Sequence, residues 1–505
     1  MKLFVDDIER FLGRYSIGRD SNPIDVTGSL HFLRIKVPGG LLTTEQFRGI
    51  ADLVGRYGRE RAEVTDRQDI QMHWIQAEDT LDIFSTMESL GFTTDMCGQG
   101  FSGAKYGDVR NIVCCPASGI VKEEILDGRP LLTSLTGHFS GNQDFLDLPR
   151  KFKISISGCG ADCTRAYIND LSFVAVRMGE DRGFTFLVGG SAGVSLPGPR
   201  LAKPTGVFVK PDEAFDVAVA TVEIYKDHGN RESKAKARFK WLIETWGVSK
   251  YVVALEEKLG WALERYDGPI FERRNAHEGV QPQSQEGSWC VNVPLVGGRL
   301  SRREMEAIAS LADEYGSGEL RLTPTQSIII PNVKRKAMVL KRLARMGFPL
   351  HGSSLRWNCM GCASDFCGKT SSPHAKEVVV DVVNHLESSF SDELLEGAGL
   401  RIHVSGCFND CGAASVADIG LIGKQIREGD EMKQVYNVFL GGCGGPEPSL
   451  GRLVEENVPT SELKQWIESL LGNYDKRRKP LESFGEFCRR HATHELKTLT
   501  KGAEH

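Results

Sequence analysis

Hydrophobic and polar side chains alternate along residues 65–74, and this alternation predicts a β-strand. Successive side chains of a strand point to opposite faces, so one face of this segment is apolar, with Ile70, Met72 and Trp74. The other face carries only polar groups, namely Arg67, Asp69, Gln71 and His73. We expect the apolar face to pack on a core and the polar face to line a site.

A second strand is predicted over residues 148–156, where Lys151 and Lys153 point to the same side. Arg110 adds a cation shortly before a pair of cysteines. Two arginines and two lysines gathered at one place would bind a small oxyanion, because arginine offers a fork of donors and lysine a point charge. Lysines crowded by arginines also have a lowered pKa, which makes them better proton donors near neutral pH. The alternative is that each cation belongs to a solvated charged face.

The chain contains an internal repeat. Each copy predicts a helix that starts with a capping-box pattern and ends near a glycine, and then a strand at residues 70–75 or 327–330. The matching helix residues are Thr43, Gln46 and Gly58 in the first copy and Ser301, Glu304 and Gly316 in the second. Further along, residues 157–163 match residues 405–411, so a larger unit follows each smaller one. The aperiodic polar stretch 268–287 is expected to be the linker.

Cysteines suggest the chemistry. Two glycine-rich loops of the second copy carry Cys359, Cys362 and Cys367, and then Cys407 and Cys411. Four thiolates on two such loops are what an iron–sulfur cluster requires, which favours a redox enzyme over a hydrolase or a binding module. The chain has 13 cysteines, which in a cytosolic protein indicate metal binding or catalysis before disulfides.

Bulk composition limits the alternatives. At 505 residues the chain exceeds one ordinary core, and 40% hydrophobic with 26% charged residues is typical of a globular soluble protein. A net charge of −5 excludes the basic excess of a dedicated nucleic-acid binder. No apolar run approaches the ~20 residues of a membrane span, and the first residues show no signal core. We therefore expect a cytoplasmic protein that requires neither membrane nor nucleic acid.

Taken in order, the motifs resemble the sulfite and nitrite reductase family that couples sirohaem to a [4Fe–4S] cluster. The matching stretches are residues 65–73, 108–111, 148–153, 321–326, 402–412 and 417–421. The resemblance implies an α+β fold with an internal duplication. Two ferredoxin-like halves form one domain, and two larger mixed-sheet domains are related to each other by a pseudo-twofold axis. The expected boundaries are 1–27 for an N-terminal extension, 28–95 and 288–352 for the halves, 96–267 and 353–505 for the larger domains, and 268–287 for the linker.

The resemblance also implies roles for individual residues. Arg67, Arg110, Lys151 and Lys153 would surround the substrate. Cys362, Cys367, Cys407 and Cys411 would hold the cluster, with Cys411 also bridging to the sirohaem iron. The sirohaem contacts would be Gln71, His73, Arg150, Lys236, Arg238, Arg321 and Asn409, since a macrocycle rich in carboxylates needs a basic, hydrogen-bonding pocket.

The implied activity is the six-electron reduction of sulfite to sulfide, with electrons from ferredoxin or a separate flavoprotein. The alternative is nitrite reduction by the same design, and Lys153 favours sulfite, because family members that act on nitrite tend to have asparagine there. A monooxygenase of corrinoid synthesis and a cluster-bearing electron carrier are lesser alternatives. The carrier would leave the four substrate cations unexplained.

Two questions about the cysteines stay open in the sequence. Cys359 is a rival of Cys362 as a cluster ligand, because neither gives the family's usual spacing to Cys367. The first copy could hold a second cluster with Cys115, Cys159 and Cys163. Ile120 stands where the fourth thiolate is needed, so Cys97 or Cys114 would have to replace it. The simpler interpretation is that Cys159 and Cys163 are relics of the duplication.

Overall fold

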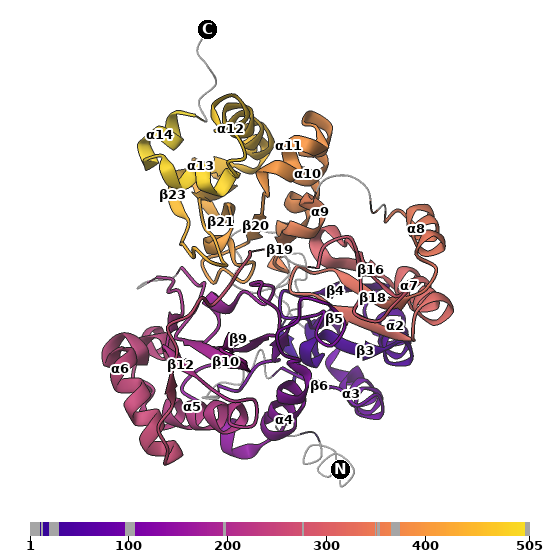
Figure 1. Ribbon diagram of the computed structural model, residues 1–505. Coiled ribbons are helices and arrows are strands. Elements are labelled where there is room, and N and C mark those ends of the chain that lie inside the picture. The colour runs from indigo at the N-terminus through magenta and orange to yellow at the C-terminus, as the bar shows by residue number, and fades with distance from the viewer. Residues whose placement is uncertain are drawn as a thin grey trace.

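The computed structural model describes residues 11, 14–19, 30–95, 107–194, 198–274, 277–348, 350, 354–364 and 374–499. Figure 1 shows three groups of elements. The ferredoxin-like halves lie together on one side, the first large domain lies beside them, and the second large domain lies above both. The expected α+β architecture with an internal duplication is confirmed.

The two halves share their sheets by exchanging a strand. The first sheet contains β1 (Gly18–Arg19), β2 (His31–Lys36), β5 (Ile70–Ile75), β4 (Arg61–Val64) and β16 (Arg299–Ser301) in that order, with β6 (Thr93–Thr94) also paired to β2. The second contains β14 (Val280–Pro282), β15 (Trp289–Val293), β18 (Ile328–Val333), β17 (Glu319–Leu322) and β3 (Leu41–Thr43). Strand β16 of the second half therefore completes the first sheet, and β3 of the first half completes the second.

The helices described in the halves are α2 (Thr44–Tyr57), α3 (Thr80–Ser89), α7 (Arg302–Tyr315) and α8 (Lys336–Arg345). Of these, α2 and α7 begin where the sequence predicts. Both predicted capping boxes form, at Thr43 with Gln46 and at Ser301 with Glu304. Each satisfies two backbone N–H groups that the first turn of a helix leaves unpaired. Helices α2 and α7 pack side by side against the shared sheets (Figure 1).

Each large domain is built on a five-stranded mixed sheet. The first contains β11 (Lys203–Pro204), β10 (Asp181–Val188), β9 (Leu171–Met178), β8 (Ile154–Ser157) and β7 (Val113–Cys114). The second contains β19 (Cys359–Gly361), β20 (Ile402–Ser405), β21 (Ile419–Glu428), β22 (Glu431–Leu440) and β23 (Arg452–Pro459). The strands β7, β8 and β9 are parallel to one another, as are β19, β20 and β21. A short ribbon of β12 (Val207–Phe208) and β13 (Glu264–Arg265) stands apart.

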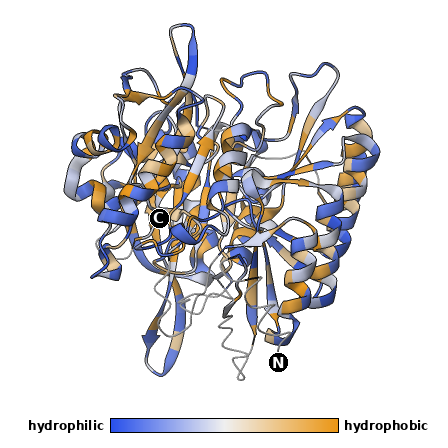
Figure 2. Ribbon diagram, turned by 90° about the horizontal axis from the view of Figure 1, so that it is seen from below, coloured by the Kyte–Doolittle hydropathy of each residue, from blue (hydrophilic) through white to orange (hydrophobic). Residues whose placement is uncertain are grey.

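Helices surround these sheets. The first large domain has α4 (Arg129–Phe139), α5 (Ala214–His228) and α6 (Phe239–Leu259). The second has α9 (Leu355–Asn358), α10 (Ala375–Ser389), α11 (Asp392–Ala398), α12 (Leu463–Arg477), α13 (Phe484–Arg490) and α14 (Thr493–Thr498). The three largest apolar cores of the described residues are one in the ferredoxin-like halves and one in each large domain. Figure 2 shows hydrophobic and hydrophilic residues alternating along these elements.

Backbone register shows which cysteines of the two copies are equivalent. The Cys115 N–H donates to the Ile156 carbonyl at 2.9 Å, and the Cys362 N–H donates to the Val404 carbonyl at 3.0 Å. Residues 156 and 404 are separated by 248, which is the offset that relates the two cysteine loops. Cys115 and Cys362 are therefore structural equivalents.

Two glutamines anchor these loops in the same way. The side-chain oxygen of Gln68 accepts the Cys114 N–H at 2.9 Å, and that of Gln326 accepts the Gly361 N–H at 3.1 Å. Both glutamines have a positive φ, of 61° and 63°. Each half thus uses one strained turn to hold the residue just before the equivalent cysteine.

Two sequence predictions need correction at strand boundaries. Strand β5 begins at Ile70, so Arg67 and Asp69 lie in the turn before it, because the positive φ of Gln68 ends the extended run. Strand β8 begins at Ile154, where its parallel pairing starts, so Lys151 and Lys153 also precede a strand. Both sets of side chains therefore lie at strand ends rather than on a sheet face.

Residues 280–282 of the predicted linker form strand β14 at the edge of the second sheet.

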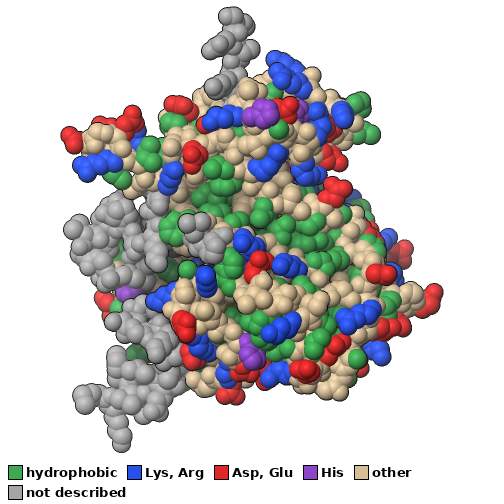
Figure 3. Space-filling model, turned by 90° about the vertical axis from the view of Figure 1, so that its left-hand side faces the viewer, with side chains coloured by type: hydrophobic (Ala, Val, Ile, Leu, Met, Phe, Trp, Pro, Cys, Tyr) green, Lys and Arg blue, Asp and Glu red, His purple; other side chains and the backbone are tan. Residues whose placement is uncertain are grey.

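Among the described residues, no helix is long and apolar enough to cross a bilayer. Figure 3 shows one face of the molecule, on which lysine and arginine side chains are interspersed with aspartate and glutamate. That mixture agrees with the modest net charge of −5.

Candidate active site

The cysteine loops of the second copy lie together at the ends of two parallel strands. Cys362 follows β19, and the loop with Cys407 and Cys411 follows β20. The Gly406 N–H donates to the Cys362 sulfur at 3.1 Å, which joins the two loops. Cys407 is buried and Cys411 is exposed. Cys367 lies outside the described residues.

A buried carboxylate shapes the second loop. Asp410 accepts hydrogen bonds from the Ser405 hydroxyl at 2.8 Å and from the backbone N–H groups of Ala414 and Ser415 at 2.6 and 2.9 Å. These bonds hold the chain in the turn that separates Cys407 from Cys411. The backbone geometry of the loop is therefore set by its own side chains.

Cys359 differs from Cys362 in its surroundings. It lies within β19, is 1% exposed and belongs to the apolar core of its domain. Burial raises the pKa of its thiol to about 12. Cys362 instead lies directly after β19, where its sulfur accepts the Gly406 N–H of the second cysteine loop, so its position favours it over Cys359 as a ligand.

Arg67 reaches from the first half into the first large domain. Its guanidinium donates to the Asn169 side-chain oxygen at 2.8 Å and to the backbone carbonyl of Asn111. The side chain is buried, and its Nε has no hydrogen-bond partner among the described residues. A buried, positively charged donor without a hydrogen-bond partner favours an anion beside it.

Lys153 lies next to this guanidinium. Burial, and then the positive charges of Arg67 and Lys151, lower the pKa of Lys153 to about 7. The Lys153 backbone N–H donates to Asp170 at 2.9 Å, which positions the start of β8. The lowered pKa that the crowded cations predict is thus present in the structure.

Arg110 belongs to the same region but is compensated by acids. Its Nε lies 3.0 Å from Asp108 and its Nη1 4.0 Å from Asp95. Burial alone would raise the pKa of Asp95, but Lys36 and Arg110 hold it at about 2. Arg110 therefore brings a positive charge whose orientation is set by two buried carboxylates.

Arg150 and Arg238 extend the cationic region. The pKa of Arg150 is lowered by burial and then by the charges of Arg238 and Arg110. Arg238 donates two hydrogen bonds to the Asp170 carboxylate, at 3.0 and 2.8 Å. Its buried Nε has no hydrogen-bond partner among the described residues. Lys236 is exposed nearby in sequence. The structure thus brings together Arg67, Arg110, Arg150, Lys151, Lys153 and Arg238.

Gln71 and His73 are both about 1% exposed. Arg34 donates twice to the Gln71 oxygen, at 2.9 and 2.7 Å, and the Gln71 amide nitrogen lies 3.0 Å from His73 Nε2. His73 in turn lies 3.6 Å from Glu63. The polar face of β5 is therefore a hydrogen-bonded buried network rather than an open surface.

Asn409 stands between Cys407 and Cys411 and is exposed. Its neighbour Phe408 accepts a hydrogen bond from the Val194 N–H at 3.0 Å, and the Ser415 hydroxyl donates to the Ala192 carbonyl at 3.2 Å. The cysteine loop of the second copy therefore contacts the loop after β10 in the first copy.

Arg321 lies elsewhere. It is fully buried, and its Nη1 donates to the carbonyls of Pro116 and Ser118 at 3.1 and 2.7 Å. These carbonyls belong to the loop after Cys115, in the first copy. The structure does not bring Arg321 to the cationic region of Arg67.

Arg165 is a central residue that the sequence reasoning missed. Its guanidinium donates to the carbonyls of Asp66 and Pro324 and to the Met360 sulfur, the last at 2.9 Å. It thereby joins the first large domain to both halves and to the strand before Cys362. Only the cysteine at position 163 marked this stretch, and nothing in the local sequence signals the long-range bonds.

The residues present fit the two implied cofactors. Cys362, Cys407 and Cys411 supply thiols on adjoining loops, as a cluster requires. The unpartnered Nε atoms of Arg67 and Arg238 offer buried donors to carboxylates or to an oxyanion. The fold and the site define a class of protein, an internally duplicated oxidoreductase.

Comparison with known proteins identifies the family. Residues 25–90 and 281–344 match the nitrite/sulfite reductase ferredoxin-like half domain, and residues 105–263 and 375–501 match the nitrite and sulphite reductase 4Fe-4S domain. The chain therefore belongs to the nitrite and sulfite reductase family. This membership confirms the expected enzyme class and its cofactors, sirohaem and a [4Fe–4S] cluster.

Individual relatives carry both substrate names. The chain is 32% identical over 452 residues to a ferredoxin–nitrite reductase of Leptolyngbya laminosa, covering 87% of this chain and 85% of the relative. It is 30% identical over 491 residues to sulfite reductase [ferredoxin] 1 of Mycolicibacterium paratuberculosis, covering 95% and 85%. The solved structure of the Mycobacterium tuberculosis NirA protein superposes with a TM-score of 0.86 at 28% identity, covering 97% of this chain and 90% of that one.

Proposed function

We propose that this protein reduces sulfite to sulfide, taking six electrons from ferredoxin. The observation that carries the proposal is Lys153, a lysine whose pKa is lowered to about 7 by burial and by the charges of Arg67 and Lys151. Sulfite reduction releases oxygen as water, so protons must be delivered at each cleavage. A lysine with a pKa near the working pH is suited to that task.

The cations have separate roles in this proposal. Arg67 and Arg110 remain charged and offset the negative charge of the substrate. Lys153 donates protons and Lys151 keeps its pKa low. Asp170 positions Lys153 through its backbone.

Cys362, Cys367, Cys407 and Cys411 would hold the cluster, and Cys411 would also ligate the sirohaem iron. Gln71, His73, Arg150, Lys236, Arg238 and Asn409 are the proposed contacts of the macrocycle. When bound, the two cofactors supply electrons one at a time. Ferredoxin is the proposed donor because it appears in the names of the sulfite- and nitrite-reducing relatives. We also propose a cytoplasmic location, because cluster thiolates and a reduced donor require a reducing compartment.

Nitrite is the second candidate substrate. Its support is that relatives named ferredoxin–nitrite reductase match this chain as well as those named sulfite reductase do, including one from Arabidopsis thaliana at 34% identity over 458 residues. The same cations would bind nitrite, which is also a small oxyanion. Substrate preference therefore has to be measured on the purified enzyme.

The test compares turnover of the holoenzyme on sulfite and on nitrite with the same reduced donor. Wild type is expected to turn over sulfite faster, and Lys153→Asn to lose more activity on sulfite than on nitrite. Lys210→Asn, an exposed lysine of the same domain, is the matched control and should keep both activities. Faster nitrite turnover by wild type would assign the enzyme to nitrite. Equal losses on the two substrates in Lys153→Asn would refute the role of Lys153 in selectivity.

A further inference from the structure

The first copy gathers four metal-ligating side chains away from the cationic region. Cys115, Cys159, Cys163 and His277 place their ligand atoms within 4.8 Å of one another. Cys115 follows β7, and Cys159 and Cys163 follow β8. His277 comes from the connection between the two repeats. The set therefore unites three segments that are far apart in the sequence.

The separations match those around one tetrahedral ion. The Cys159 sulfur lies 3.8 Å from that of Cys115 and 3.7 Å from that of Cys163. His277 Nε2 lies 3.2 and 3.4 Å from the sulfurs of Cys115 and Cys159. With usual zinc bond lengths, tetrahedral ligands are separated by about 3.8 Å for two sulfurs and about 3.5 Å for sulfur and nitrogen.

Other uses of these cysteines fit less well. A disulfide would bring two sulfurs to about 2.05 Å. A [4Fe–4S] cluster would separate its thiolates widely, because each thiolate binds a different iron of the cube. The equivalent cysteines of the second copy illustrate this difference. Among the residues that the structure describes, only the first-copy group gathers within 4.8 Å.

The surroundings enclose the group and place positive charge beside it. Apolar neighbours, including Ile120 and Val121, form a small core around the three cysteines. Two buried guanidiniums flank the site. Arg321 binds the carbonyls beyond Cys115, and Arg165 lines the cavity next to Cys163 and His277. Three thiolates on a divalent ion leave one negative charge, which Arg165 offsets, because Arg321 is already paired with Glu319 at 2.7 Å.

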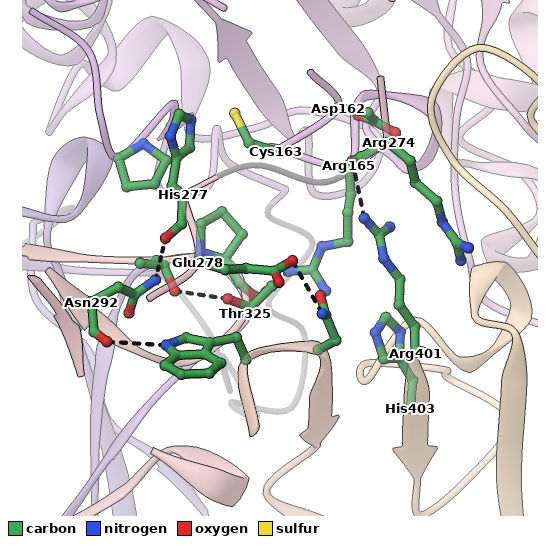
Figure 4. A pocket seen from close by; sticks show the side chains of 15 residues that line it. Asp162, Cys163, Arg165, Arg274, His277, Glu278, Asn292, Thr325, Arg401 and His403 are labelled. Carbon is green, nitrogen blue, oxygen red and sulfur yellow. Dashed lines mark hydrogen bonds between the residues drawn. The ribbon is translucent and has the colours of Figure 1, made fainter. Parts of the chain in front are cut away.

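His277 is held in position from outside the group. Its carbonyl accepts a hydrogen bond from the Asn292 side-chain N–H at 2.6 Å. The residue is buried, with 6% of its surface exposed. Figure 4 shows the Cys163 thiol and the His277 ring beside each other at one end of the cavity. Asn292 belongs to β15, so the second half orients His277. His277 supplies the fourth ligand, which Ile120 of the first copy cannot provide.

We propose that Cys115, Cys159, Cys163 and His277 bind one zinc ion, a structural metal separate from the sirohaem and the cluster. Soft thiolates with an imidazole select zinc or iron over magnesium or calcium. Four protein ligands leave no open position, which is typical of structural zinc. The ion would fasten the connection between the repeats to the first copy. The duplicated cysteines of this copy then serve as ligands of a different metal rather than as relics.

The test measures zinc and iron per chain in the purified holoenzyme made with ample supply of both. We expect one zinc per chain in wild type and less than a tenth of that in Cys159→Ser and His277→Ala. Both variants should keep the visible spectrum of the sirohaem and cluster. Cys290→Ser is the matched control, because Cys290 belongs to the same apolar core without being a ligand, and it should keep its zinc.

X-ray absorption at the zinc edge of the wild-type enzyme tests the ligand set even where a variant fails to fold. We expect three sulfurs and one nitrogen around the ion, at about 2.3 and 2.0 Å. Zinc that persists in both variants would overturn the proposal, as would wild type without zinc. Four additional irons per chain would instead show a second cluster. A mass two hydrogens lower, mapped to these cysteines, would show a disulfide.

Discussion

The lowered pKa of Lys153 predicts an alkaline limb in the pH–rate profile. If the protonated lysine donates protons to the departing oxygens, turnover falls as the pH rises through its pKa. An ordinary lysine has a pKa near 10.5 and would stay charged over the whole working range, whereas that of Lys153 is about 7. A limb that changes when this residue is replaced would therefore be assigned to Lys153.

The magnitude follows from the enclosure of the ammonium group. A change from 10.5 to about 7 corresponds to roughly 5 kcal/mol of lost preference for the charged form. Burial contributes most, followed by Arg67 and Lys151. The carboxylates of a bound macrocycle act in the opposite direction, because they favour the ammonium. The limb in kcat/KM is therefore expected between about pH 7 and 9.

The assay is sulfide release by the holoenzyme from pH 6 to 10, in wild type and two variants. Lys153→Arg should lower turnover and remove the part of the limb that Lys153 causes, since a guanidinium stays charged across this range. Lys151→Gln should keep the limb but move it up by about half a unit to one unit, because a repelling charge has gone. The arginine variant also isolates the ionisation of sulfite itself, which titrates near neutral pH.

Two results would refute this reasoning. An alkaline limb that persists unchanged in Lys153→Arg would show that another group titrates. A limb that moves down in Lys151→Gln would show that Lys151 does not repel the proton on Lys153. In either case proton delivery would have to be assigned elsewhere.

Three further outcomes follow from the structure. Cys362→Ser should remove the cluster iron and Cys359→Ser should leave it, as iron analysis checks; the reverse would make Cys359 the ligand. Glu63→Gln should lower the free energy of unfolding by about 3–5 kcal/mol above pH 5 and by less toward pH 3, because it leaves buried cations uncompensated. Urea unfolding measures this change. Glu314→Gln, at an exposed ion pair, is the control and should show no such change. Arg165→Met should cost about 3 kcal/mol in the same measurement, and an unchanged midpoint would deny it a bridging role.

The sign for Glu63 comes from its surroundings. Burial alone would raise the pKa of this carboxyl, but Lys376, His73 and Arg299 lower it far below its usual value. A group with a lowered folded pKa stabilises the protein above its unfolded pKa of about 4.3. That contribution is lost as the pH falls, so wild type and Glu63→Gln should converge in acid.

The sequence predicts the local parts of this fold well. Capping boxes at Thr43 and Ser301 locate two helix starts, because the signal lies within four residues. The repeat offsets locate the equivalent cysteine loops, and backbone register agrees with them. Strand β5 covers residues 70–75, as the repeat predicts, whereas the alternation of side chains alone extended the strand back to residue 65.

The long-range contacts of individual side chains could not be predicted from the local sequence. Arg321 and Arg67 look alike in sequence, yet one binds the carbonyls beyond Cys115 and the other reaches Asn169. His277 lies in a stretch without periodicity, and only its bond to Asn292 reveals that it is held in place. Such roles depend on which segments meet in space, and the pattern along the chain does not contain that information.

The pseudo-twofold relation predicts two equivalent positions, of which the one beside Cys163 is too small for a macrocycle. Arg165 and Ala413 are equivalent by the offset of 248, and both have a left-handed backbone, with φ of 54° and 57°. In the first copy the long side chain of Arg165 fills the space beside Cys163, where the cavity retains about 40 Å³. In the second copy alanine leaves Cys411 exposed.

The cations diverge in the same way. Arg401 is the equivalent of Lys153, but it donates to the Arg274 carbonyl at 3.0 Å and lines the small cavity. Thr325 is the equivalent of Arg67 in the second copy, and its hydroxyl lies within hydrogen-bond distance of the Thr323 hydroxyl, at 3.1 Å. A cavity of about 40 Å³ admits a few atoms and no tetrapyrrole. Duplication thus supplied two equivalent positions, and side-chain substitution closed one of them while the other kept its thiols and gained a cationic partner.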